Sequence, residues 1–222
     1  SDAAKVAQFN TINAATTSPV VLTGGVSDTA AAYAATDGTT TAGLTAIAAQ
    51  DPNAVITVSD AAKVAQFNTI NAATTSNVVL TGGVSDTAAA YAATNGTTTA
   101  GLTAIAAQDG DVAITISDAP TVAQLVTINA ATTGAITLTT ANGALSGTAA
   151  NLVSAFAGTV TEHTGTVTVT DAATVAQFNT INAETTQDVV LTGGVSDTAA
   201  AYAAANGTTT AGLTAIAAQD GD

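Results

Sequence analysis

The sequence lacks cysteine, methionine and tryptophan, and it is poor in aromatic residues and in cations. Without cysteine, the fold contains no disulfide and no thiolate metal site. Among 222 residues only Lys5 and Lys63 are basic, against 16 carboxylates, which gives a formal net charge of -14. Such a charge repels nucleic-acid phosphates and anionic membrane surfaces. We therefore expect no nucleic-acid partner.

Long apolar runs are lacking as well. No apolar stretch reaches the roughly 18 residues that a membrane-spanning helix needs, so we expect no membrane span. Hydrophobic residues nevertheless make up 47% of the chain and charged residues only 8%. Most of this apolar content is Ala, Val, Leu and Ile, whose side chains suit close and regular packing. We expect an ordered chain with a large apolar core.

The sequence consists of internal repeats. The segment VVLTGGVSDTAAAYAA occurs three times without a change, starting at Val20, Val78 and Val189. A Ser-Asp or Thr-Asp pair lies at or near the start of each of four long repeats, which span residues 1–58, 59–116, 117–169 and 170–222. Each long repeat divides into two half-units of roughly 24 to 32 residues, a period typical of solenoids. We expect a single array over residues 1–222.

Each half-unit is predicted to contain a helix followed by a strand. In AAKVAQFNTINAAT, Val6, Phe9 and Ile12 share one face at helical spacing, and the preceding Ser-Asp pair offers oxygens to the helix start. Short β-branched runs such as VVLT and AVITV then predict strands. In the second half-units a pair such as Asp37-Gly38 interrupts the helical region, which predicts two short helices with a tight break.

Alternating helices and strands indicate the fold class. They require parallel strands joined by crossovers, which are right-handed in nearly all proteins. A closed eight-stranded barrel of this kind takes about 250 residues, and near-identical repeats provide no means of closing a ring. We expect an α/β repeat solenoid with one parallel β-strand per rung, helices on one side and right-handed crossovers.

Two repeated motifs resemble a known group of repeats. Helix starts such as VSDTAA and TVAQ, separated by Thr/Val strands, resemble the Ala/Thr-rich α/β solenoid repeats of very large bacterial surface and secreted proteins, which are described as haemolysin-like or adhesin-like. The resemblance covers the whole chain and transfers no catalytic residue. It implies an extracellular or cell-surface scaffold.

The aspartates allow two interpretations. At a helix start a carboxylate accepts backbone N–H bonds and meets the positive end of the helix dipole. Seven aspartates lie at predicted helix starts: Asp2, Asp28, Asp60, Asp86, Asp118, Asp171 and Asp197. The alternative is calcium, because two Asp-Gly-Asp turns carry hard oxygen ligands. The candidate ligands are Asp109, Asp111, Asp220 and Asp222. Two carboxylates make an incomplete cage, so calcium is a possible cofactor only, and no other cofactor is expected.

Amide side chains recur even where their apolar neighbours change. Glutamine occupies one repeated position, at Gln8, Gln66, Gln124 and Gln177. Asparagine occupies another, at Asn13, Asn71, Asn129 and Asn182. Buried backbone N–H and C=O groups need partners, so these amides are predicted to bind the backbone at helix ends or between rungs. For asparagine we predict a ladder.

No enzyme site is expected. His163, beside Glu162, is the one histidine, and we expect it in an exposed turn. No phosphate-binding glycine loop is present, and no Ser/His/Asp set can be assembled. Aromatic residues recur at equal helical positions, which indicates a core role. They are Phe9, Phe67 and Phe178, with Leu125 in the third repeat, and Tyr33, Tyr91 and Tyr202.

Three functions remain open. The first is a structural segment of an extracellular bacterial protein: a spacer, stalk, fibre or surface-layer component. The second is a calcium-dependent adhesive or secretion module. The third is a ligand- or ice-binding sheet face, because Thr166, Thr168 and Thr170 alternate with valines, although three valines, Val21, Val79 and Val190, fall on that same face. No atypical capping repeat is present, so we expect a longer array or head-to-tail self-association.

Overall fold

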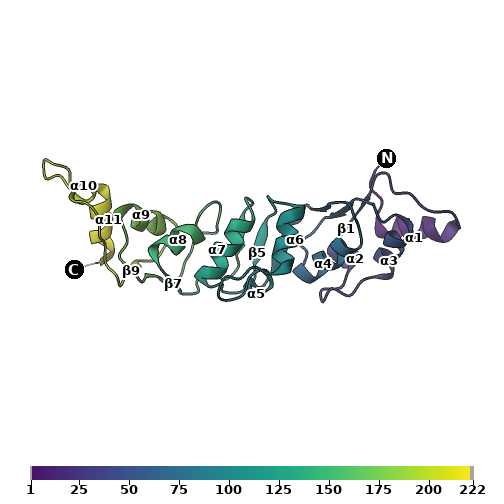
Figure 1. Ribbon diagram of the computed structural model, residues 1–222, viewed down its shortest axis with the longest axis horizontal. Coiled ribbons are helices and arrows are strands. Elements are labelled where there is room, and N and C mark those ends of the chain that lie inside the picture. Colours follow the sequence, from purple (N-terminus) through teal and green to yellow (C-terminus); the bar gives the residue numbers. More distant parts are fainter. Residues whose placement is uncertain (1, 221–222) are drawn as a thin grey trace.

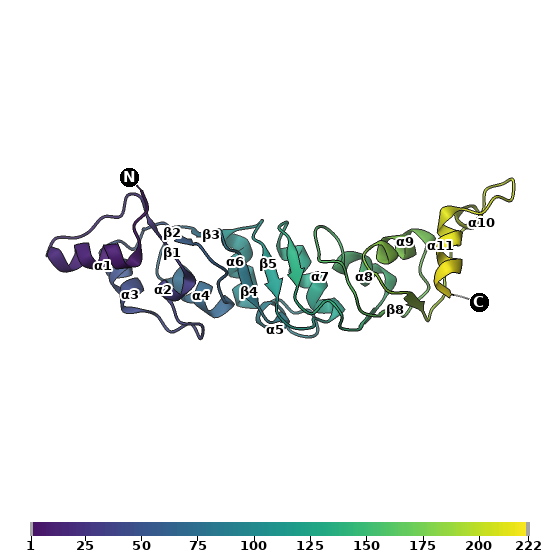
Figure 2. The same ribbon diagram turned by 180° about the vertical axis from the view of Figure 1, so that it is seen from behind.

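The computed structural model describes residues 2–220 of the chain. Its fold is mixed α/β, and the described residues form three small parallel sheets and no closed barrel. The molecule is elongated, with the first repeat at one end and the fourth at the other (Figures 1 and 2). The parallel strands and their alternation with helices confirm the α/β part of the predicted fold class.

Helices occupy the connections between strands. The first half-units contain α1 (Val6–Ala15), α4 (Val64–Ala72), α7 (Val122–Ala131) and α9 (Val175–Ala183). The second half-units contain pairs of helices: α2 (Ala30–Tyr33) with α3 (Ala42–Gln50), α5 (Ala88–Tyr91) with α6 (Ala100–Gln108), and α10 (Ala199–Tyr202) with α11 (Ala211–Asp220). The third repeat has α8 (Ala149–Ala155) in place of a pair.

The predicted break between paired helices is confirmed. Between α2 and α3 the chain turns at Gly38, whose φ of 87° lies in the left-handed region that glycine tolerates best. The side-chain Oδ1 of Asp37 accepts the Thr39 N–H at 2.9 Å, which closes the turn.

Three-residue strands pair in parallel. The first sheet contains β1 (Val26–Asp28), β2 (Ile56–Val58) and β3 (Val78–Leu80). The second contains β4 (Val84–Asp86), β5 (Ile114–Ile116) and β6 (Ile136–Leu138), and the third contains β7 (Leu145–Gly147), β8 (Val167–Val169) and β9 (Val189–Leu191). In the first two sheets paired residues are 30 and then 22 positions apart, and in the third both separations are 22.

Two details of the predicted repeat are wrong. The VSD segments expected to begin helices form β1 and β4, and the helices that follow them, α2 and α5, begin after the aspartate. The first helix, α1, likewise begins at Val6 and not at Asp2. A stretch such as residues 78–86 therefore contains two strands, β3 and β4, instead of one strand per rung. Pairing with neighbouring strands overrides the local preference of Ser and Asp for helix starts.

Strand formation depends on a neighbour as well as on sequence. VVL forms strands at residues 78–80 and 189–191, beside β2 and β8, but not at residues 20–22, where Val21 is 70% exposed. Likewise VSD is a strand at residues 84–86, whereas at residues 195–197 only Val195 forms a bridge, to Ala173. A three-residue strand has no internal hydrogen bonds, so it requires a paired edge.

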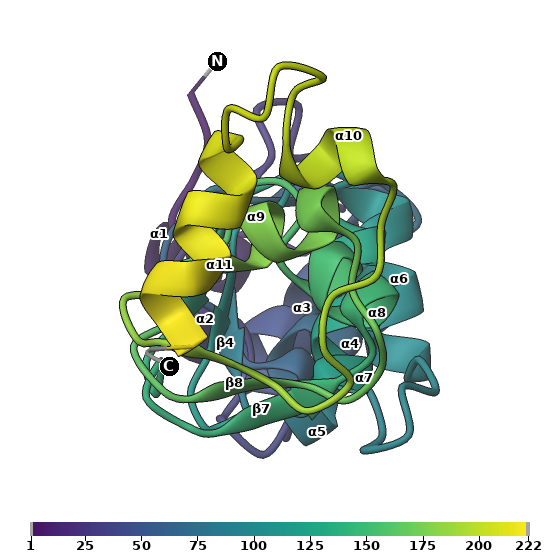
Figure 3. The ribbon, with the colours of Figure 1, turned by 90° about the vertical axis from the view of Figure 1, so that its left-hand side faces the viewer.

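The core lies between the strands and the helices, which are arranged around it in the view along the long axis (Figure 3). In β2, β3, β5, β6 and β8 the side chains at the first and third positions are buried, and Val26, Ile56 and Val58 are fully buried. The predicted core positions are confirmed for most aromatic residues. Phe9, Phe67, Phe178, Leu125, Tyr33 and Tyr91 are fully buried, and Tyr202 is half-buried.

Candidate functional site

We call the stretch of chain from one strand to the next strand paired with it a coil. The aspartates of the Ser-Asp pairs bind backbone N–H groups at helix starts, and each of these helices lies in the coil before the aspartate. Three of them lie 22 residues after the N–H they accept. Asp28 Oδ2 accepts the Val6 N–H at 3.1 Å, and Asp86 Oδ2 accepts the Val64 N–H at 3.0 Å. The third, Asp197, binds the Val175 N–H at 3.0 Å. These carboxylates cap α1, α4 and α9.

The other aspartates cap the second half-units in the same way. Asp60 Oδ1 accepts the Ala30 N–H at 2.6 Å from 30 residues away, and Asp118 does the same for Ala88. In the shorter third repeat Asp171 binds the Ala149 N–H at 2.7 Å, 22 residues away. Sequence reasoning predicted helix capping, but no local signal shows that the capped helix lies one coil earlier.

Both cations lie beside these caps. The Nζ of Lys5 is 3.9 Å from Asp28 Oδ1, and the Nζ of Lys63 is 3.8 Å from Asp86 Oδ1. The lysines are partly exposed, and such pairs contribute about 0–1 kcal/mol to stability. The backbone bonds of the aspartates therefore dominate these clusters.

The repeated glutamines also bind backbone at the helix starts. The Oε1 atoms of Gln8, Gln66, Gln124 and Gln177 accept the N–H of the residue before each helix, at 2.8–2.9 Å. Two of them reach the preceding coil too, because Gln66 Nε2 donates to the Ala34 carbonyl and Gln124 Nε2 to the Ala92 carbonyl, both at 2.8 Å. Glutamine thus joins a helix start to the adjoining coil.

The asparagines do not form a continuous ladder within residues 2–220. Asn129 Nδ2 donates to the carbonyls of Ser154 at 2.9 Å and Ala157 at 2.7 Å. The remaining three, Asn13, Asn71 and Asn182, are half-buried and have no side-chain hydrogen bond among the described residues. α7, which carries Asn129, packs against α8, and the C-terminal turn of α8 offers carbonyls that lack helical partners.

A second set of glutamines was missed by sequence reasoning. The Oε1 atoms of Gln50, Gln108 and Gln219 accept the N–H groups of Val20, Val78 and Val189 at 3.2, 3.1 and 2.7 Å. Asp51 Oδ2 similarly accepts the Leu22 N–H at 2.9 Å. The sequence signal that could have identified these glutamines is their common position at the end of a helical segment. These side chains bind backbone that lies 29 or 30 residues earlier.

In the described part of the chain no third acidic or histidine side chain joins the calcium candidates. Asp109 directly follows α6, and burial, followed by the hydrogen bond and charge of Asp111, raises the pKa of its carboxyl. Within residues 2–220 no three acidic or histidine side chains form a group suited to a metal ion. The side chain of Asp220 and all of Asp222 lie outside the described residues.

The expectation that His163 is exposed is wrong. Its side chain is buried, with 2% of the residue exposed, and neither ring nitrogen has a hydrogen-bond partner among the described residues. Its backbone pairs with Thr185, because the single helix α8 shortens this half-unit and draws residues 160–163 into the sheet region. The ring centroid lies 6.1 Å from that of Phe156.

The outer sheet face carries Ser, Thr and Val in register. Rows across the sheets are Ser27, Thr57 and Val79, then Ser85, Thr115 and Thr137, then Ser146, Thr168 and Val190. Val79 is 40% exposed and Val190 44% exposed, which confirms that valine interrupts the Thr pattern on this face.

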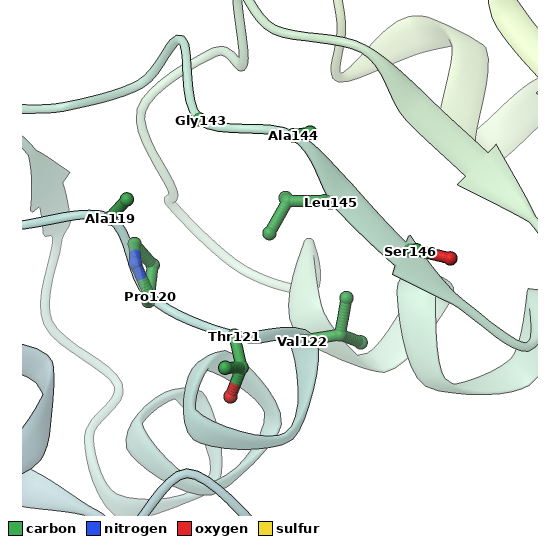
Figure 4. Close-up of a pocket in the computed structure, with 8 residues that line it drawn as sticks. All are labelled: Ala119, Pro120, Thr121, Val122, Gly143, Ala144, Leu145 and Ser146. Carbon is green, nitrogen blue, oxygen red and sulfur yellow. The ribbon is translucent and has the colours of Figure 1, made fainter.

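A pocket of about 310 Å³ opens in the third repeat, between residues 119–122 and 143–146 (Figure 4). Its lining contains no charged side chain.

No helix within residues 2–220 is long and apolar enough to cross a membrane. Comparison with protein-family models, curated proteins and solved structures finds no match.

Proposed function

We propose that this chain is an α/β solenoid and serves as an architectural segment of an extracellular bacterial protein: a spacer, stalk, fibre or surface-layer component. The observation that carries the proposal is the capping of helices across coils. Six aspartates bind the first N–H of a helix 22 or 30 residues earlier in the chain. Each coil thus receives hydrogen-bond acceptors for its helix starts from the next coil, as in a one-dimensional stack whose repeats contact only their neighbours.

The use of the repeated polar side chains supports a structural role. Where a site binds a substrate, convergent polar groups face a cavity and remain available to the ligand. Here the repeated aspartates and glutamines bind backbone groups of their own chain. The extracellular and bacterial assignment rests on the resemblance of the Ala/Thr-rich repeats to those of surface and secreted proteins.

We also propose that the end repeats join further repeats, in a longer array or in other copies of the chain. The support is the behaviour of identical segments. VVL at residues 20–22 pairs with no strand, and VSD at residues 195–197 is joined only to Ala173, whereas the same letters form paired strands inside the molecule. An unpaired strand edge is a template for another strand.

Imaging the native protein tests the architectural role. The full-length particle is viewed by electron microscopy with an antibody fragment raised against this chain. We expect the label along a stalk, a fibre or a layer. A label confined to a compact head that carries a catalytic or binding domain would contradict the proposal.

Calcium titration separates the architectural role from a calcium-dependent module. A ligand that binds only the folded state raises the midpoint of thermal unfolding by mass action. We expect the same midpoint in a chelator and in millimolar Ca²⁺, with Mg²⁺ as the control for ionic strength. A midpoint that rises with Ca²⁺ and not with Mg²⁺ would favour the adhesive or secretion module instead.

A further inference from the structure

The third repeat interrupts a backbone ladder that the other repeats form. In the first repeat the Ala4 N–H donates to the Gly25 carbonyl at 3.0 Å, and the Ser27 N–H donates to the Ala4 carbonyl at 2.9 Å. The same two bonds join Ala62 to Gly83 and Ser85, and Ala173 to Gly194 and Ser196. The central alanine is thus held to the next coil through both its N–H and its carbonyl.

Pro120 occupies the position of this alanine in the third repeat and has no N–H to donate. Ser146 is the counterpart of Ser27, and it lies between Leu145 and Gly147, whose backbone groups bond to the β8 side. The Ser146 N–H therefore faces Pro120. Neither this N–H nor the Pro120 carbonyl has a hydrogen-bond partner in the described structure.

A further contact is missing at the same place. In the other repeats an aspartate carboxylate binds the first N–H of the helix, as Asp86 does for Val64. Gly147 stands where that aspartate would be, so the Val122 N–H has no partner among residues 2–220. In the described structure the N–H groups of Ser146 and Val122 and the carbonyl of Pro120 therefore lack hydrogen-bond partners, and all three border one gap.

The gap is the pocket of about 310 Å³. Figure 4 shows Leu145 on one side and Pro120 and Val122 on the other, directed toward the space between the two segments. The lining side chains are small or apolar, and none is charged. The volume lies at the lower end of the range of about 300–1,000 Å³ in which ligand pockets fall.

We propose that this pocket binds a short extended peptide segment with small, uncharged side chains. An extended backbone presents carbonyl acceptors and N–H donors along its edges, which is what the open groups of Ser146, Val122 and Pro120 require. In the other repeats the chain's own extended backbone at Ala4, Ala62 and Ala173 accepts the serine N–H, while an aspartate carboxylate accepts the first N–H of the helix. The uncharged lining gives no advantage to an ion, and the small volume excludes large side chains.

The test is a titration of the ¹⁵N-labelled chain with the peptide acetyl-Ala-Ser-Ala-amide, followed through the backbone amide signals of Ser146 and Val122. We expect saturable shifts of both signals. A peptide of the same sequence with N-methylated amides loses its donors, and we expect it to bind at least about tenfold more weakly. Absence of saturation at these two signals, or equal binding of the methylated peptide, would overturn the proposal.

A variant that closes the gap provides the second arm. Pro120→Ala restores the N–H, and Gly147→Asp restores the carboxylate; a Cβ on Gly147 meets Val122 Cγ1 at 3.2 Å, which a small shift relieves. We expect the double variant to lose peptide binding and to unfold at a higher temperature. Pro52→Ala, a proline-to-alanine change outside the pocket, is the matched control and should bind as the wild type does. Binding that persists in the double variant would place the peptide elsewhere and refute the site.

Discussion

Asp86 shows how a single residue joins two coils. Its Oδ2 accepts the Val64 N–H at the start of α4, its Oδ1 accepts the Thr87 N–H at 2.9 Å, and Lys63 lies beside it. A carboxylate at a helix start both accepts an N–H that lacks a helical partner and meets the positive end of the helix dipole. Residues of this kind, rather than large apolar side chains alone, fix one coil against the next.

Replacing Asp86 with alanine should destabilise the fold. Loss of a helix cap costs about 0.5–2 kcal/mol, and here a second backbone bond is lost with it. We expect the free energy of unfolding in urea to fall by about 1–2 kcal/mol. Asp188→Ala is the matched control, because Asp188 is exposed and has no side-chain hydrogen bond in the described structure. Equal stabilities of the two variants would show that the cross-coil cap has no energetic role.

His163 gives stability a dependence on pH. Burial lowers the pKa of His163 below its usual value of about 6.5, so below that pH the unfolded chain binds a proton that the folded chain resists. Stability should therefore fall as the pH drops from about 6.5, until the pKa of the folded state is reached. Urea denaturation between pH 7.5 and pH 5 measures this. Because the chain has one histidine, His163→Leu should flatten the slope. An unchanged slope in that variant would assign the effect to other groups.

At the scale of elements, identical sequences take different structures according to their neighbours. The letters VVL form β3 where β2 lies alongside, and they form no strand at residues 20–22. Local preference for extended structure is the same in both places. The difference lies in the partner edge, which supplies the hydrogen bonds that a short strand cannot make internally.

Hydrogen exchange measures this difference directly. Val21 and Val79 have the same adjacent residues, so their intrinsic exchange rates match closely. We expect the amide of Val79, in paired β3, to exchange at least about tenfold more slowly than that of Val21. Equal protection would mean that residues 20–22 are also paired in solution.

Close contact between turns and the preceding coil predicts a steric effect at Gly82. A Cβ at this position would lie 2.1 Å from the carbonyl carbon of Asp60, so the two coils would have to separate. We expect Gly82→Ala to lower the free energy of unfolding by about 1–3 kcal/mol. At Gly110 the nearest atom to a new Cβ is 3.8 Å away, so Gly110→Ala should be nearly neutral. A similar loss in both variants would contradict the close packing of coils.

The sequence predicted the features that are local and missed those that depend on coil offset. The buried Phe and Tyr positions and the break at Asp37-Gly38 follow from spacing and turn chemistry within a few residues. The partner of Asp86 is 22 residues away, and the separation alternates between 22 and 30 in the first two repeats. Burial of His163 likewise results from the single helix of the third repeat. No local sequence pattern predicts the separation between bonded residues or the strand pairing that follows from it.

At the scale of the whole molecule, coils joined end to end produce an elongated shape (Figures 1 and 2). Each coil packs on its neighbours in the chain, and the apolar core runs from Val6 to Val189 as one cluster. In such a molecule each repeat contacts only its neighbours, so the length of the molecule increases with the number of repeats. This property suits a spacer or a stalk, and it distinguishes the chain from a compact domain of equal size.

Small-angle X-ray scattering of the chain in solution tests the central claim most directly. A compact domain of 222 residues has a radius of gyration of about 17 Å. We predict a value clearly above this and an asymmetric distribution of interatomic distances with a long tail, the same with and without Ca²⁺. A radius of gyration near 17 Å with a symmetric distribution would contradict the stacked arrangement of coils and the architectural role proposed from it.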